Sequence, residues 1–167
     1  SCDETNVSLY GGNDGFVSYL GGSNTDYGYG VVETSDGGFV VTGQTQSYGG
    51  GDYDVLLVKF DSSGNEIWTK SLGGSNHDYG LGVVETSDGS FVVTGYTRSY
   101  GGSDVDVLLA KFDSSGNEIW TKSLGGSNQD YGYGVVETSD GGFVITGQTQ
   151  SYGGSDVDVL LAKFDSS

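Results

Sequence analysis

The stretch EIWTKSLGGSN occupies residues 66–76 and recurs unchanged at residues 118–128. Other positions recur with the same step of 52 residues, so that Lys59 reappears as Lys111 and as Lys163. The chain therefore divides into an extension, residues 1–11, and three repeats, residues 12–63, 64–115 and 116–167. Because self-similarity at a fixed period indicates a repeat architecture, we expect one structural domain built from three copies of one unit.

Each repeat predicts four short β-strands. In the second repeat they are residues 66–72, 82–86, 91–97 and 106–112, which are rich in β-branched and aromatic residues and are separated by turn clusters. The Asp88-Gly89 pair supplies the positive φ angles of a tight hairpin turn. The stretch 106–112 is nearly all apolar, which indicates a strand buried on both faces. Glycine interrupts every window that could hold a helix, so no helix is predicted.

Four antiparallel strands about every 50 residues are typical of the blades of a β-propeller. We therefore predict an all-β fold, a β-propeller-like array of three four-stranded antiparallel blades. The segments IWTKSLGGSNQDYG (119–132), DGGFVITG (140–147) and DVLLAKFD (158–165) resemble the SBBP-like β-propeller repeats of bacterial and archaeal secreted and cell-surface proteins. The resemblance implies a blade fold and an extracellular or cell-surface location, and it carries no catalytic residues.

The two ends of the array predict how it is completed. The last blade has three strands of its own, and a strand around Phe16 and Val17 is expected to supply the fourth. Supplied within one molecule, that strand closes a ring, whereas supplied between molecules it links subunits head to tail. Val7 and Leu9 alternate with polar residues and predict a second candidate donor strand. The alternative for residues 1–11 is a frayed terminus.

Charge and composition exclude several partners. Six basic and 23 acidic residues give a net charge of −17, which excludes nucleic acid, because phosphate binding needs a basic footprint. No apolar run approaches 18 residues, so membrane insertion is not expected. Cys2 is the only cysteine, which excludes an internal disulfide and a thiolate metal site.

Repeated carboxylates in the loops suit a calcium ion. Each repeat carries two aspartates two residues apart, which point to the same side of an extended chain, and Ca²⁺ prefers such oxygen ligands. The candidate calcium ligands are Asp52, Asp54, Asp104, Asp106, Asp156 and Asp158. The alternative is that these aspartates only stabilise turns.

Positions that differ between the repeats predict a contact face, because the architecture does not fix them. Tyrosine beside glycine and amide groups makes adaptable contacts with sugars and proteins. The candidate contact residues are Tyr48, Tyr96, Arg98, Tyr100, Gln148, Gln150 and Tyr152. The alternative is an ordinary polar loop face.

No catalytic motif recurs or stands out. His77, the only histidine, aligns with Thr25 and Gln129, so it is not part of the repeating unit. We therefore expect a non-catalytic extracellular structural protein that forms a homo-oligomer or polymer, for example a surface filament linked by strand complementation. The alternative is a propeller module that binds glycans or proteins at the cell surface.

Overall fold

The computed structural model describes residues 15–102, 104–154 and 156–166. Every regular element in this part of the chain is a β-strand, and the strands form three antiparallel sheets. The first sheet contains β1 (Asp26–Glu33), β2 (Phe39–Thr45), β3 (Asp54–Phe60) and β4 (Glu66–Leu72). The second contains β5 (Asp78–Glu85), β6 (Phe91–Thr97), β7 (Asp106–Phe112) and β8 (Glu118–Leu124). The third contains β9 (Asp130–Glu137), β10 (Phe143–Thr149) and β11 (Asp158–Phe164).

The predicted strands of the second repeat are confirmed, with one difference in length. Three of them have the predicted ends, but β5 begins at Asp78, four residues before the predicted start. The sequence does not predict this extension, because Gly80 and Gly82 interrupt the run of β-branched residues. An added Cβ at Gly80 would stand 2.1 Å from Thr42 Oγ1 of the first sheet. Glycine is therefore required there by close sheet packing rather than by a turn.

The sheets are offset from the sequence repeats by one strand. Each four-stranded sheet takes three strands from one repeat and its last strand from the next, so that β4 of the first sheet begins the second repeat. The β3–β4 and β7–β8 hairpins turn at Gly64 and Gly116, which have φ angles of 82° and 78°. Each repeat is thus tied to its neighbour by backbone pairing as well as by side-chain packing.

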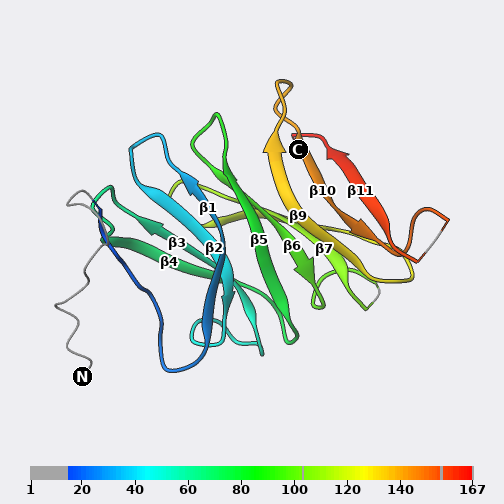
Figure 1. Cartoon of the computed structure of the whole chain (residues 1–167), viewed down its shortest axis with the longest axis horizontal. Coiled ribbons are helices and arrows are strands. Elements are labelled where there is room, and N and C mark those ends of the chain that lie inside the picture. Colours follow the sequence, from blue (N-terminus) through cyan, green and yellow to red (C-terminus); the bar gives the residue numbers. More distant parts are fainter. Residues whose placement is uncertain (1–14, 103, 155, 167) are drawn as a thin grey trace.

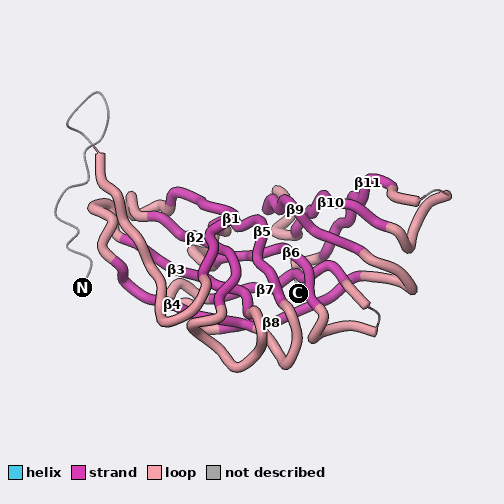
Figure 2. Tube along the Cα trace, turned by 60° about the horizontal axis from the view of Figure 1, so that its bottom comes forward, coloured by secondary structure: helices cyan, strands magenta, loops and turns pink. Residues whose placement is uncertain are grey.

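The three sheets follow one another along the molecule, with the first sheet at one end and β11 at the other (Figure 1). Figure 2 shows that the outer strands β4 and β8 lie on one side of the array and β1 and β9 on the opposite side. β7 is buried along nearly its whole length, as its apolar sequence predicts. The core lies between successive sheets rather than within one of them.

The expectation that an N-terminal strand completes the last blade is wrong for the isolated chain. Among the described residues the third sheet has three strands, and β11 pairs with β10 alone. Residues 15–20 form no strand and lie against the first sheet, at the opposite end of the array. The Phe16 ring packs 5.9 Å from the Phe39 ring, so the segment cannot reach β11 of the same molecule. No sheet closes the array into a ring.

Candidate functional sites: the ends of the array and a tyrosine strip

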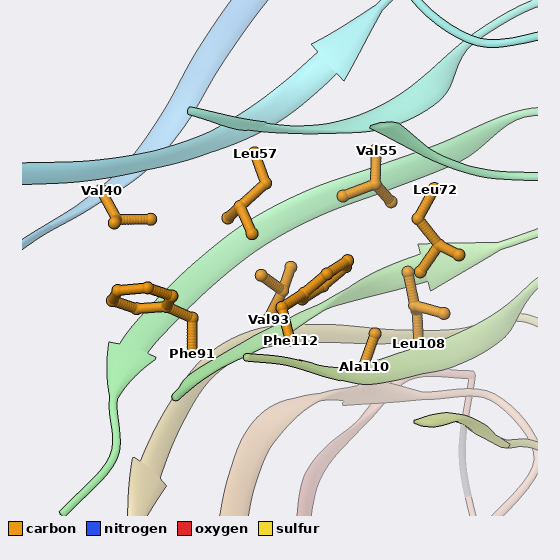
Figure 3. Close-up of a cluster of buried hydrophobic side chains, with 9 residues drawn as sticks. All are labelled: Val40, Val55, Leu57, Leu72, Phe91, Val93, Leu108, Ala110 and Phe112. Carbon is orange, nitrogen blue, oxygen red and sulfur yellow. The ribbon is translucent and has the colours of Figure 1, made fainter. Parts of the chain in front are cut away.

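The junction between two sheets is the repeating unit of packing. In the first junction, Val40, Val55 and Leu57 of the first sheet meet Phe91 and Leu108 of the second. Figure 3 shows these side chains pointing toward one another from the two sheets. The second junction repeats the arrangement 52 residues later, with Val107 and Leu109 facing Phe143 and Leu160. Each sheet therefore packs on the following sheet with one apolar face and on the preceding sheet with the other. We call these the forward face and the backward face.

Aromatic contacts mark each junction at its outer strand. The Trp68 ring lies 6.0 Å from Phe91, and the Trp120 ring lies 5.9 Å from Phe143, both at an interplanar angle of 58°. Both tryptophans therefore pack between successive sheets. The two junctions therefore share one geometry as well as one composition.

Polar contacts repeat in the same way. The Ser35 backbone N–H donates to a Glu85 carboxylate oxygen at 2.7 Å, and its hydroxyl donates to the other oxygen at 3.0 Å. Ser87 makes the same two bonds to Glu137, with the same lengths. A serine on the forward side of one sheet thus recognises a glutamate on the next.

None of the described residues packs on the apolar side chains that β11 exposes on the forward face of the third sheet. Val107 and Leu109 of β7 are completely buried, whereas their counterparts Val159 and Leu161 of β11 are 84% and 73% exposed. β11 is also an edge strand on this side. An exposed apolar face beside an unpaired strand edge is typical of an interaction surface.

The backward face of the first sheet is open as well. It holds a cavity of about 260 Å³ lined by Phe16, Ser18, Val31, Phe39, Val41 and Phe60. Val31 is 66% exposed, whereas its counterpart Val83 is half-buried against the preceding sheet. The two ends of the array therefore carry the two complementary halves of one junction.

The predicted assembly residues fall in two groups. Val7 and Leu9 lie outside the described residues. Phe16 packs on Phe39 in the way that Trp68 packs on Phe91, which is 52 residues further along in both partners. Val17 is 54% exposed. The segment thus already stands where the outer strand of a preceding sheet would stand.

A strip of aromatic rings runs across the three sheets, from the residue before β3 through β5 and β6 to the beginning of β9. Tyr79 stacks on Tyr96 with ring centroids 4.4 Å apart, and Tyr96 meets the edge of Tyr131 at 5.0 Å. Tyr53 contacts both His77 and Tyr79. We call Tyr53, His77, Tyr79, Tyr96 and Tyr131 the tyrosine strip.

Three members of the tyrosine strip, Tyr53, His77 and Tyr96, come from positions that differ between repeats. Arg98, the only arginine, lies beside them, because its backbone N–H donates to the His77 carbonyl at 2.9 Å. Arg98 also approaches Asp104 at 4.0 Å. The only histidine and the only arginine of the chain therefore meet at one asymmetric cluster in an otherwise repeating fold.

The predicted contact face is only partly assembled. Tyr96 and Arg98 meet in the cluster, but Tyr100 packs against the core between the first two sheets. Tyr152 donates its hydroxyl to the Gly125 carbonyl at 2.8 Å. Gln148 is the cross-strand partner of Tyr131, and the Gln150 backbone N–H donates to the Gln129 carbonyl at 2.9 Å. The ring contacts found among the described residues do not join Tyr48 to the tyrosine strip. Comparison of the second and third repeats missed Tyr53, because both of its counterparts are valine and only the first repeat differs there.

The geometry around His77 does not activate a nucleophile. Its Nδ1 lies 3.1 Å from the Tyr79 hydroxyl, and its Nε2 lies 3.5 Å from an Asp52 oxygen. Burial raises the pKa of Tyr79 above its usual value, which is the opposite of what a tyrosinate nucleophile needs. His77 does not line either of the two cavities described on the first sheet.

The predicted calcium ligands do not converge. Asp54 is 2% exposed, and one of its oxygens accepts the backbone N–H groups of Gly50 and Gly51 at 2.9 and 3.2 Å. The Asp52 side chain, in contrast, is exposed and lies beside His77. Among the described residues no group of three or more His, Cys, Asp or Glu side chains could hold a metal ion. Asp54, Asp106 and Asp158 instead anchor glycine loops.

No family model matches the chain. A relative named regulatory protein FlaEY, from Caulobacter vibrioides, is 29% identical over 153 residues, which cover 82% of this chain. The chain spans only 16% of that relative's length. The likeness therefore concerns one segment of a much longer protein. In the described part of the chain there is no helix that is long and apolar enough to cross a bilayer.

Proposed function

We propose that the chain is a non-catalytic extracellular structural protein whose copies join head to tail through the two open ends of the sheet array. The observation that carries this proposal is the contrast between Leu109, fully buried in the second junction, and Leu161, which is 73% exposed at the same position of the third sheet. Burying such leucine side chains contributes about 1.5–3 kcal/mol each. Contact between copies would therefore bury the apolar side chains that the last sheet exposes to water.

The physics of repeat proteins supports the same proposal. Each repeat buries its apolar face only against a neighbour, so arrays need terminal units with a polar outer face to stay monomeric. Neither the first nor the last of the three described sheets has such a face. Edge strands are commonly protected by proline or by inward charges, but the sequence contains no proline. The ends are thus built like interior surfaces.

The extracellular location rests on the resemblance to the SBBP-like repeats of secreted and cell-surface proteins. A propeller-like arrangement of the sheets belongs to the same proposal. The acidic composition suits a surface role, because a net charge of −17 keeps copies soluble until a specific contact forms.

Sedimentation velocity of the purified chain tests head-to-tail assembly. We expect species larger than one chain at high micromolar concentration, and monomers alone for Leu161→Arg, which places a charge on the forward face. Ile119→Arg is the matched control, since Ile119 is 53% exposed on the middle sheet, and it should leave assembly intact. Monomeric wild-type protein at every concentration would refute the proposal.

A second candidate function, binding of glycans or of a protein at the tyrosine strip, is favoured by the convergence of non-repeated residues there. Phenol rings with hydroxyl groups offer stacking faces and hydrogen bonds to sugars. The relative named as a regulatory protein is consistent with a binding role. A glycan array tests it: Tyr96→Ala should abolish binding, whereas Tyr152→Ala, outside the strip, should keep it. Absence of binding by the wild-type chain would count against this candidate.

A further inference from the structure

We infer that the tyrosine strip and Arg98 together bind an acidic sugar, that is, a pyranose ring carrying a carboxylate, as in polysaccharides that contain uronic acids. This inference rests on the second candidate function, binding at the tyrosine strip. It adds the chemical class of the ligand and the side chain that recognises its charge. The argument compares this cluster with the equivalent place 52 residues later in the same chain.

The backbone at the two places is the same. The Arg98 N–H donates to the His77 carbonyl at 2.9 Å, and the Gln150 N–H donates to the Gln129 carbonyl at 2.9 Å. Arg98 and Gln150 are 52 residues apart, as are His77 and Gln129. The fold therefore forms at this position with either set of side chains.

The side-chain contacts of His77 are also made by a neutral glutamine. The His77 Nδ1 atom lies 3.1 Å from the Tyr79 hydroxyl. At the equivalent place the Tyr131 hydroxyl donates to the Gln129 carbonyl oxygen at 2.8 Å. A glutamine is thus sufficient for packing here, and packing does not explain the imidazole.

Four positions distinguish the cluster from its equivalent. The equivalent place has Val105, Gln129, Gln148 and Gln150 where the cluster has Tyr53, His77, Tyr96 and Arg98. The cluster therefore gains two phenol rings, an imidazole and one permanent positive charge. Because the fold forms without these groups, we take them as the recognition elements. They suit a ligand that has a face for stacking and a negative group.

Arg98 is placed to bind that negative group. Its side chain is 45% exposed, and it approaches the Asp104 carboxylate only at 4.0 Å, which is longer than the roughly 2.7–2.9 Å of a charge-assisted hydrogen bond. Burial raises the pKa of the Tyr79 hydroxyl, and the nearby Arg98 charge partly offsets that rise. The guanidinium thus lies near the rings, and it can bind a carboxylate through two parallel N–H···O bonds.

The aspartates beside the cluster do not make it a cation site. Asp52 and Asp104 have a counterpart in Asp156, so an aspartate at this position belongs to every repeat. The net charge of −17 repels an anion at long range, but charges beyond about 8 Å are largely screened at physiological ionic strength. The positive charge that is special to this place, on Arg98, therefore decides the preference at short range.

The rings supply stacking faces and hydrogen-bond donors. All five side chains of the tyrosine strip are half-buried, and none of them lines either of the cavities described on the first sheet. Burial raises the pKa of both Tyr79 and Tyr96, so their hydroxyls stay protonated and can donate to ligand oxygens. Pockets for small molecules are concave, whereas this shallow surface suits a sugar chain lying along it.

Isothermal titration calorimetry of the 167-residue chain tests the ligand class. The probes are tetrasaccharides of galacturonic, mannuronic and guluronic acid and of hyaluronan, each paired with its methyl ester, which keeps the rings and loses the charge. We expect at least one acid to bind about tenfold or more tightly than its ester, as a hydrogen-bonded charge pair contributes. Equal affinity of acid and ester would overturn the inference while leaving glycan binding at the strip standing. Absence of binding by every probe would overturn the inference, and binding of neutral glycans on the array would then still support the second candidate function.

Substitutions borrowed from the equivalent place test the recognising side chains without disturbing the fold. A fourfold variant carries Tyr53→Val, His77→Gln, Tyr96→Gln and Arg98→Gln. It should melt like the wild type and lose binding of the acid. Arg98→Gln alone should weaken binding of the acid by about tenfold or more and leave binding of the ester unchanged. Lys70→Gln removes the same charge from β4, outside the cluster, and should bind like the wild type. Full binding by Arg98→Gln, or equal losses in Arg98→Gln and Lys70→Gln, would overturn the assignment.

Discussion

Leucine-to-alanine substitutions at two equivalent positions test the buried sheet junction and the exposed forward face separately. Leu109 and Leu161 occupy the same place in β7 and β11, but Leu109 is completely buried between the second and third sheets, and Leu161 is 73% exposed. Replacement of a buried leucine by alanine removes its transfer free energy and leaves a cavity, which together cost about 2–5 kcal/mol. Leu109 is in the centre of its cluster, so we expect about 3 kcal/mol for Leu109→Ala.

Leu161→Ala should behave differently. In a monomer the change should alter the free energy of unfolding by less than about 0.5 kcal/mol. Where copies associate, the same variant should lose stability only at high protein concentration, because association adds to apparent stability by mass action.

Urea denaturation followed by tryptophan fluorescence, at low and at high micromolar protein, measures both effects. If Leu109→Ala costs less than about 1 kcal/mol, the junction between the second and third sheets does not exist as described. If Leu161→Ala costs as much as Leu109→Ala in dilute monomeric protein, the forward face of the third sheet is covered within the chain.

Three further predictions concern single substitutions. Trp68→Ala should cost roughly 2 kcal/mol in urea denaturation, about half the value for a fully buried tryptophan, because Trp68 is half-buried against Phe91; a cost near zero would place it on the surface. Gly95→Ala should destabilise the fold by roughly 3 kcal/mol in urea denaturation, because the added Cβ would stand 1.7 Å from the Tyr79 carbonyl oxygen. Gly102→Ala is the control and should leave the stability unchanged, because the space around Gly102 is open. A hydrogen bond from the Thr86 hydroxyl, and second to it one from Lys111, holds the pKa of Asp88 well below its ordinary 3.8. The ionised carboxylate therefore stabilises the fold above pH 3.8, and this contribution disappears as the pH falls further. The stability difference between wild type and Asp88→Asn, measured from pH 7 to pH 2, should shrink below pH 4, and a difference that grows there would contradict the assignment.

The strand pattern is readable from the sequence because local signals agree with the packing. Asp106–Phe112 is nearly all apolar and is buried on both faces, as predicted. Of the Asp88-Gly89 pair, Gly89 has the predicted positive φ angle, 76°, whereas Asp88 does not. The boundary of β5 was less predictable. Glycines 80 and 82 are not strand formers, and their place in β5 depends on contacts with the first and third sheets. Such contacts are tertiary and leave no local signature.

The candidate sites depended even more on tertiary placement. Spacing alone put Asp52 and Asp54 side by side, but the glycine loop turns Asp54 inward and leaves Asp52 outside beside His77. Phe16 is in register with Trp68 in the sequence, and its packing on Phe39 repeats the packing of Trp68 on Phe91. Its location at the first sheet rather than at β11 follows from the offset between sheets and repeats, which the repeat period does not reveal.

We propose that another copy completes the open edge of the last described sheet, and hydrogen exchange measures that edge directly. Amides of β7 are in a strand paired on both sides, whereas β11 pairs only with β10 in the isolated chain. We predict that protection of residues 158–164 is low in dilute protein and rises with concentration to the level of residues 106–112. Exchange of residues 158–164 that stays the same at all concentrations, whether slow or fast, would contradict the claim.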